Sequence, residues 1–414
     1  MLRAIGIALA CGLLVAGGAR AAEISISCSA VGLELELCRD GAQRWARESG
    51  NSVRLVSTPN SASERLALYQ QLLAAGSPDI DVLQIDVVWP GILARHLLDL
   101  RPYAGRRPAA HFASIVANDT VRGKLVAMPW FADVGLLYYR KDLLAKYGVE
   151  VPRTWPALTV AARRIQDAER AAGKARMWGF VWQGRAYEGL TCDALEWIAS
   201  RGGGRIVEPD GTISVDNPRA ARALAAAAGW VGSISPRGVL NYAEEEARGV
   251  FQSGNAVFMR NWPYARALAE SEGSPVRGLV GVAALPAGAG VLGGAQLAVS
   301  RYSRHPRLAA SLVMALTGRA EQKRRALAGG FNPTLPALYR DAEIRRANPY
   351  YDVMAQALAH AVARPAAVTG TRYNRVSSAF SNAVHAVLVG QADAATALHS
   401  LEGSLMRISR GGQW

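Results

Sequence analysis

Three carboxylates occupy apolar surroundings in which a charge is costly to bury. Asp133 interrupts the run Met128–Tyr139, whose aromatic and aliphatic residues are typical of a buried strand. Asp86 follows Ile85 in a second apolar stretch, and Glu34 comes just after the first predicted strand. An ionised carboxylate accepts two hydroxyl groups, so vicinal diols suit it. Each acid therefore either pairs within the protein or faces a cleft in which a polar ligand supplies the hydroxyls.

An indole, a phenol and a guanidinium are further candidates. Trp262 and Tyr264 belong to a proline turn that follows a predicted strand. The C–H faces of a sugar pack well on such rings; the alternative is a core tryptophan in a turn. Arg364 precedes a proline. It either reaches a ligand or is a solvated arginine beside a break in the helix. Trp89 and Trp130 are expected in the core.

These side chains need a scaffold, and the N-terminal half supplies a β-α-β pattern. Predicted strands at 24–28, 53–56 and 81–85 alternate with helices at 35–48 and 63–75. This alternation favours a parallel sheet flanked by helices. Ligands of such sheets bind beyond the carboxyl ends of the strands. Glu34 and Asp86 both lie there, although Asp86 also precedes a helix that begins at Pro90, so capping explains it equally well.

The rest of the chain is mixed. Its predicted elements are helices at 155–172, 191–200 and 218–231, strands at 178–182, 257–260 and 297–300, a short helix after Gly249, and mainly helix from Pro306 onward. No internal repeat or heptad run is evident. The pattern predicts an α/β protein.

Length and composition bound the class of protein. The 414 residues suffice for two domains with full cores. Arg3, the apolar run Ala4–Val15 and the small residues Ala19 and Ala21 predict a signal peptide over residues 1–22. The run is too short to span a bilayer. We therefore expect an exported, soluble mature chain.

The net charge of +14 comes almost entirely from arginine. Basic chains often bind nucleic acid. Here the arginines are scattered, so we expect solvated helix faces and no nucleic-acid partner. Cys28, Cys38 and Cys192 remain after cleavage. Their odd number excludes full pairing; a Cys28–Cys38 bridge stays open, and small buried thiols are favoured.

Enzyme signals are weak. The segment Gly288–Gly293 fits G-x-G-x-x-G, but a strand follows it where a dinucleotide site needs a helix. The six histidines show no metal spacing. We expect no cofactor and no metal. A glycoside hydrolase that uses two of the carboxylates stays open.

Four segments resemble ABC-transporter sugar-binding proteins of solute-binding protein family 1, and trehalose/maltose-binding proteins in particular. They are Gln84–Gly91, Met128–Gly148, Gly179–Asp193 and Asn261–Tyr264, in family order within a resemblance that spans about Glu23 to Ser404. The resemblance implies a two-lobed periplasmic binding protein of type II with a ligand cleft between the lobes. The chain would cross near 131–135, 287–297 and 330–339.

The resemblance also implies lobes, site and partners. Lobe 1 would hold residues 23–131 and about 293–335, and lobe 2 residues 132–292 and about 336–414. The implied ligand-binding residues are Glu34, Arg65, Asp86, Phe131, Asp133, Trp262, Tyr264, Gly294 and Arg364. The implied protein is a monomeric periplasmic binder, not an enzyme. It would deliver a trehalose- or maltose-like sugar to an inner-membrane ABC permease with ATPase subunits; a polyol or other solute is the same-fold alternative.

Three departures separate the chain from these relatives. Ala295 stands where relatives commonly have tryptophan, which removes a stacking platform, and Leu33 stands where a polar residue is usual. Phe131 replaces a frequent tyrosine and loses a hydroxyl. The particular sugar therefore stays open.

Overall fold

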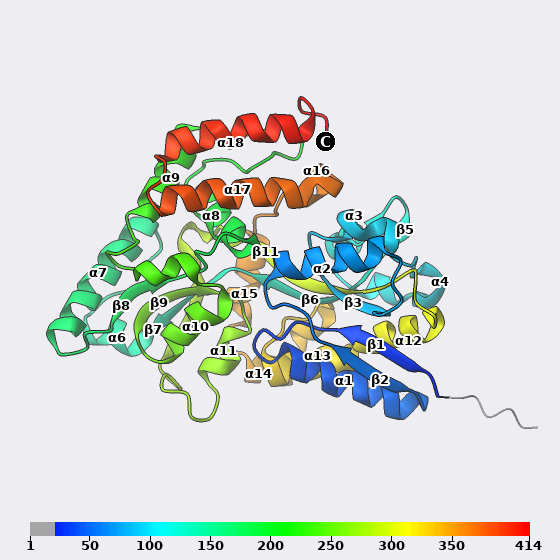
Figure 1. The fold of residues 1–414 in the computed structure, drawn as a ribbon. Helices are drawn as coiled ribbons and strands as arrows, with labels where there is room; N and C mark the ends of the chain where they lie inside the picture. The colour runs from blue at the N-terminus through cyan, green and yellow to red at the C-terminus, as the bar shows by residue number, and fades with distance from the viewer. Residues whose placement is uncertain (1–20) are drawn as a thin grey trace, which may run out of the picture.

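The computed structural model describes residues 21–414, so the predicted signal peptide lies outside the described residues except for its last two positions. Two sheets, each with its own helices, form the two lobes (Figure 1). We call the part around the five-stranded sheet lobe 1 and the part around the four-stranded sheet lobe 2. The predicted α/β class is confirmed.

The sheet of lobe 1 has the order β2-β1-β3-β11-β6. Its strands are β1 (Glu23–Ser27), β2 (Ser52–Val56), β3 (Val82–Asp86), β6 (Met128–Val134) and β11 (Leu292–Val299). The first three are parallel, as predicted, and β11 runs antiparallel to both β3 and β6. The strand β11 thus brings a distant segment of the chain between the two strands that carry Asp86 and Asp133.

Helices cover both faces of this sheet (Figure 1). They are α1 (Glu34–Ser49), α2 (Ala62–Ala74), α3 (Pro90–Leu93), α4 (Arg101–Ala104), α5 (Ala113–Asn118), α12 (Pro306–Leu316) and α13 (Arg319–Gly329). Alternate strand residues serve the two faces: Val82 packs with α1 and α12, whereas Leu83 and Ile85 pack with α2 and α3. A small hairpin, β4 (Thr120–Val121) and β5 (Lys124–Leu125), precedes β6.

The sheet of lobe 2 has the order β10-β7-β9-β8. Its strands are β7 (Leu136–Arg140), β8 (Trp178–Val181), β9 (Ala256–Asn261) and β10 (Val280–Ala284). Its helices are α6 (Lys141–Lys146), α7 (Trp155–Ala171), α8 (Glu188–Ala199), α9 (Pro218–Ala228), α10 (Glu244–Gln252), α11 (Ala265–Ala269), α17 (Tyr373–Leu388) and α18 (Ala394–Ser409). Figure 1 shows α17 and α18 side by side along the top, and both pack on α9.

One apolar stretch of the sequence is divided between the two sheets. The run Met128–Tyr139 supplies β6 to lobe 1 and β7 to lobe 2, and Gly135 alone separates them. The Gly135 amide donates to the carbonyl of Val291, in the segment that connects β10 to β11, at 3.1 Å. Two connections between the lobes therefore run side by side.

The third connection is long. After α13 the chain forms α14 (Ala342–Ala347), α15 (Tyr351–Ala359) and α16 (Ala366–Thr369) before it enters α17. The helix α15 contacts both β6 and β10, so it spans the two sheets. Val362 then pairs with Val291 in a short parallel bridge. Arg364 follows two residues later, which places it at the boundary between the lobes.

The favoured interpretation of Cys28 and Cys38 as free thiols is wrong: the structure joins them in a disulfide. The loop between β1 and α1 brings their Cα atoms to 6.5 Å, within the range that a disulfide spans. Cys192 is a buried free thiol, as expected. Trp89 and Trp130 are each 1% exposed, which confirms their predicted place in the core. Over residues 21–414, no helix combines the length and apolarity that a bilayer crossing requires.

Candidate functional site

A cavity of about 100 Å³ lies between the lobes. Lobe 1 lines it through β3, β6, β11 and the starts of α1 and α2, and lobe 2 through the start of α8, the start of α10 and the turn after β9. Every residue that the sequence predicted for the site is among its walls: Glu34, Arg65, Asp86, Phe131, Asp133, Trp262, Tyr264, Gly294 and Arg364. The fold thus gathers side chains up to 330 positions apart.

Two acids of lobe 1 line the cavity and form no ion pair with the part of the chain that the structure describes. Glu34 is the first residue of α1 and is 7% exposed; Asp133, near the end of β6, is 9% exposed. Burial raises the pKa of Glu34, and the Ser29 hydroxyl and the nearby Arg65 partly offset this. Burial, reinforced by the charge of Glu34, raises the pKa of Asp133 to about 8. At neutral pH Asp133 therefore carries a proton and can both donate and accept hydrogen bonds.

Asp86, Arg364 and Glu188 form a buried ion-pair chain across the cavity wall. Arg364 donates from Nη2 to Asp86 Oδ1 at 2.9 Å and from Nη1 to Glu188 Oε1 at 2.7 Å. Tyr373 and Ser377 also donate to Glu188. Asp86 also accepts from the amide of Val88 at 3.1 Å, so the local turn role and the pairing role coexist.

Aromatic side chains form two walls of the cavity. In lobe 2, Trp262 donates from Nε1 to Glu244 at 3.4 Å, and the guanidinium of Arg260 stacks on its ring at 4.0 Å. Arg260 is fully buried, and an ion pair between its Nη2 and Glu196 Oε1 at 2.6 Å holds it in place. In lobe 1, Phe131 packs edge-on against Phe331, with ring centroids 5.0 Å apart.

Glycine makes the approach of these walls possible. A Cβ on Gly293 would meet the Trp262 ring at 2.8 Å, so only a glycine lets this indole lie against β11. Gly294 has φ +115 and lies against the Phe131 carbonyl. Its backbone thus fits the bulge between β11 and β6 that follows at Ala295. Its contribution is shape, since it has no side chain to offer a ligand.

Tyr264 and Arg65 have partners within the protein. The Tyr264 hydroxyl donates to Glu245 at 2.7 Å, and its ring lies against Gly32 of lobe 1. Arg65 donates to the Pro59 carbonyl at 3.3 Å and stacks on Trp89 at 5.6 Å. Its Nε has no hydrogen-bond partner among the described residues. Arg65 thus retains a free donor beside the cavity, whereas the Tyr264 hydroxyl is already engaged.

Some residues that line the cavity were not predicted from the sequence. Glu188 lies in the segment expected only to frame the cleft, and Glu244, Gln84 and Phe331 were not singled out. Glu188 and Glu244 are the first residues of α8 and α10, where acids are common as favourable partners of the helix dipole, so their type carried no signal. Cys192 also lines the cavity, and burial raises the pKa of its thiol well above the usual value. It is therefore a neutral thiol at physiological pH.

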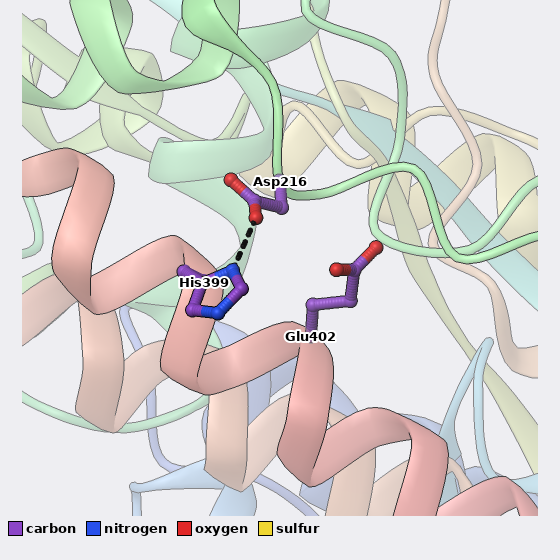
Figure 2. Close-up of side chains that lie close together, drawn as sticks. All are labelled: Asp216, His399 and Glu402. Carbon is purple, nitrogen blue, oxygen red and sulfur yellow. Dashed lines mark hydrogen bonds and ion pairs between the residues drawn. The ribbon is translucent and has the colours of Figure 1, made fainter.

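A separate cluster lies outside the cavity, on lobe 2. Asp216, His399 and Glu402 point toward one another, and each has a ligand atom within 4.8 Å of the others (Figure 2). His399 Nδ1 is 2.9 Å from Asp216 Oδ2, and its side chain is 80% exposed. Sequence spacing gave no sign of this group because Asp216 lies before α9 and the other two lie on α18. It consists of a hydrogen-bonded His399–Asp216 pair with a neighbouring acid.

The geometry of the cavity suits a polyhydroxylated guest. Carboxyl groups and Arg65 offer acceptors and donors from lobe 1, and the indole of Trp262 offers a flat apolar face from lobe 2. Asp133 Oδ1 is buried and has no partner among the described residues, which leaves it available to a ligand. Arg364 pairs with acids of both lobes, so the wall of the cavity also links the lobes.

Comparisons with known proteins agree on one family. The sequence profile described as bacterial extracellular solute-binding protein matches residues 39–323. A "probable ABC transporter-binding protein" of Deinococcus radiodurans is 51% identical over 406 residues, which cover 96% of each chain.

Solved structures extend the likeness. Maltose-bound MalE3 of T. maritima is similar with a TM-score of 0.89 and 38% identity, over 94% of this chain and all of that one. A solute-binding protein of Thermotoga lettingae bound to α-D-tagatose shares the fold, with a TM-score of 0.83 and 22% identity, over 94% of this chain and 99% of that one. The expected two-lobed periplasmic binding fold is confirmed.

Proposed function

Because the chain belongs to the bacterial extracellular solute-binding protein family, we propose that it captures one particular class of solute, a maltose- or trehalose-like sugar, between its lobes. It then hands the sugar to an inner-membrane ABC permease with ATPase subunits. As a member of this family, the chain is the substrate-binding component of an ABC transporter for sugars or polyols. The choice of sugar and its delivery are our proposal.

One observation supports the sugar most strongly. Asp133 is a buried acid whose Oδ1 has no partner among the described residues, and it lies in a cavity that the Trp262 ring also lines. A hydroxyl donor and an apolar C–H face on one small molecule satisfy both groups, and sugars combine the two. The 38% identity with a maltose-bound protein adds support for maltose itself.

The same proposal assigns the ligand contacts and the lobes. Glu34, Asp86, Asp133, Arg65 and Phe131 contact the sugar from lobe 1, with Gly294 shaping the wall, and Trp262, Tyr264 and Arg364 contact it from lobe 2 or the boundary. Lobe 1 comprises residues 23–134 with about 292–335, because β6 extends to Val134 and β11 begins at Leu292, and lobe 2 comprises 135–291 with about 336–414. The protein acts as a periplasmic monomer exported by the peptide at 1–22, and it catalyses no reaction.

Closure follows from differential binding. A sugar that touches Asp133 on one lobe and Trp262 on the other makes both contacts only when the lobes are shut. Its binding free energy is therefore larger in the closed state, and it shifts the population toward that state. A permease that docks the closed form would then receive loaded protein.

A thermal-shift panel tests the proposal. Pure protein is heated with maltose, trehalose, polyols such as ribitol and mannitol, and amino acids. A tight ligand raises the melting temperature by mass action. We expect the largest rise with a disaccharide, and no rise with the same sugar in Asp133→Ala protein that folds normally. If polyols or amino acids alone raise the melting temperature, the sugar assignment is wrong.

A glycoside hydrolase is the competing function, because two cavity acids differ in environment as such enzymes require. Incubation with labelled maltose and trehalose separates the two functions. Recovery of intact disaccharide after saturable binding supports capture. Release of glucose that Asp133→Asn abolishes would replace capture by hydrolysis.

A further inference from the structure

Arg325 is a buried charge without a hydrogen-bond partner. It lies in α13, is 1% exposed, and none of its Nε, Nη1 and Nη2 atoms has a partner among the described residues. Leaving a buried cation unpaired costs several kcal/mol. The fold would not retain such a group at this site without a compensating interaction, so its surroundings need an explanation.

Aromatic rings surround this guanidinium. Its Cζ lies 3.9 Å from the centroid of Trp130, 4.4 Å from Phe331 and 5.4 Å from Phe131. Cation–π attraction offsets part of the lost hydration. Phe131 and Phe331 also line the cavity, so Arg325 lies directly behind this wall, separated from the ligand space by aromatic rings.

A contrast with Arg260 is informative. That residue also stacks on a cavity aromatic, Trp262, but it is fully neutralised by bidentate hydrogen bonds to Glu196 and by Asp193. Arg325 has no such partner. The acid next to it on the same helix face, Glu321, is already bound by Arg324 at 2.6 Å and by Arg44 at 3.4 Å.

The acids that can balance the charge of Arg325 are those that line the cavity. Asp86 and Glu188 pair with Arg364, whereas no cation within residues 21–414 forms an ion pair with Glu34 or Asp133. Burial lowers the pKa of Arg325 to about 10, so this side chain stays cationic at neutral pH. Three acids partly offset the lowering, and Glu34 does so more than Glu321 or Asp133. Other charged or titratable groups near the pair are Arg65 beside Glu34, and Asp86, Tyr138, Tyr339 and Tyr350 near Asp133.

We propose that Arg325 is a positioning residue of the site: from behind the aromatic wall its charge prevents Glu34 and Asp133 from both being protonated, and so preserves one carboxylate acceptor for a ligand hydroxyl. The part of this statement that concerns ligand rests on the proposed function. The part that concerns the two acids does not, because it applies to the empty site. Burial favours the protonated form of Asp133, and the charge of Arg325 favours the ionised form of Glu34.

The ligand-free protein gives the decisive readout. The infrared C=O band of protonated carboxyl groups is followed between pH 4 and pH 9, with Glu34→Gln and Asp133→Asn used to assign the bands. We expect Arg325→Met to move the Glu34 midpoint upward by about one pH unit, which is a tenfold change in proton affinity. Arg325→Lys keeps the charge and should move it much less. Lys323→Met, which removes a half-buried charge of the same helix that pairs with Asp341 and Glu343, should leave it in place.

A double-mutant cycle of unfolding free energies tests the proposal if Arg325→Met is poorly stable. If Arg325 acts on Glu34, its loss harms the protein less once Glu34→Gln has removed the acid. The double variant should therefore be more stable than the sum of the single changes predicts. An unshifted midpoint in Arg325→Met, strict additivity, or failure of both Arg325→Met and the double variant to fold would overturn the proposal.

Maltose binding supplies the functional arm. In Arg325→Met the affinity should fall about tenfold at neutral pH and recover as pH rises, because deprotonation restores the acceptor. A wild-type protein that binds no sugar would reject the proposed function, while the infrared titration would still decide the role of Arg325.

Discussion

Arg364 and Asp86 form an ion pair that ties the boundary of lobe 2 to the sheet of lobe 1, with Nη2 and Oδ1 at 2.9 Å. The guanidinium is 2% exposed and the carboxylate 19%. Two further contacts join the lobes nearby: Arg185 pairs with Glu64, and the Glu188 amide donates to the Ser63 hydroxyl at 3.2 Å. The protein thus supplies its own links between the lobes.

Loss of Arg364 should weaken sugar binding strongly. Arg364→Ala leaves Asp86 and Glu188 as unpaired acids in the wall, and truncating one partner of a buried charge pair costs about 2–5 kcal/mol. We expect the maltose affinity, measured by calorimetry, to fall at least about thirtyfold. Arg345→Ala is the matched control, because it removes a pair with Asp352 that is largely exposed. Equal effects of the two variants would show that the Arg364 link is irrelevant to binding.

Asp133 should make the ligand-free protein less stable as pH rises. Its folded pKa of about 8 exceeds the ordinary value of 3.8, so between these values the native state holds a proton that the unfolded state has lost. The free energy of unfolding therefore falls with rising pH, by up to about 1.4 kcal/mol per unit. Asp133→Asn removes this component. Urea unfolding at pH 4 to 8 measures it.

The difference between wild type and Asp133→Asn isolates this acid from other titrating groups. Burial lowers the pKa of His111 to about 4, which gives the opposite slope below pH 6.5 in both proteins. A difference that is constant over pH 4 to 8 would show that Asp133 ionises normally.

Gly135 should tolerate no side chain. A Cβ there would overlap Glu196 Oε1 and lie 2.7 Å from Arg260 Nη2, two groups fixed in a fully buried ion pair. We expect Gly135→Ala to lower the free energy of unfolding by about 2 kcal/mol or more, as overpacking does. Gly249→Ala, at an exposed position of α10 with open space around it, should be neutral or stabilising. Denaturant unfolding of both variants compares them directly.

Trp262 should contribute to affinity through its ring. Trp262→Leu removes the aromatic face while it keeps an apolar side chain, and we expect maltose to bind about tenfold more weakly, near the upper value for one aromatic contact. Trp178→Leu is the control: its ring is also stacked by an arginine, Arg170 at 4.3 Å, but it lies away from the cavity. A Trp262→Leu protein with wild-type affinity would remove this residue from the site.

The sequence predicted the elements whose local pattern is strong. The parallel order of β1, β2 and β3 follows from the β-α-β alternation, and Glu34 and Asp86 lie at the carboxyl ends of strands as that topology requires. Asp133 was identified from the sequence because a carboxylate is costly to bury in an apolar strand. The remaining wall residues were assigned through family resemblance.

Other features depend on contacts that no local pattern encodes. The run Met128–Tyr139 looks like one strand, and its division at Gly135 depends on the distant Glu196 and Arg260. The Cys28–Cys38 disulfide depends on how α1 turns back toward β1. Arg325 looks like any other arginine of a charged helix, and only its burial behind Trp130 and Phe331 distinguishes it.

A crystal structure with the sugar that gives the largest thermal shift tests the central claim most directly. The account predicts density for an intact sugar in the cavity between the lobes, with a hydroxyl within hydrogen-bond distance of Asp133 and a ring face on Trp262. Density at another place on the protein, or an empty cavity in crystals grown with saturating sugar, would contradict it.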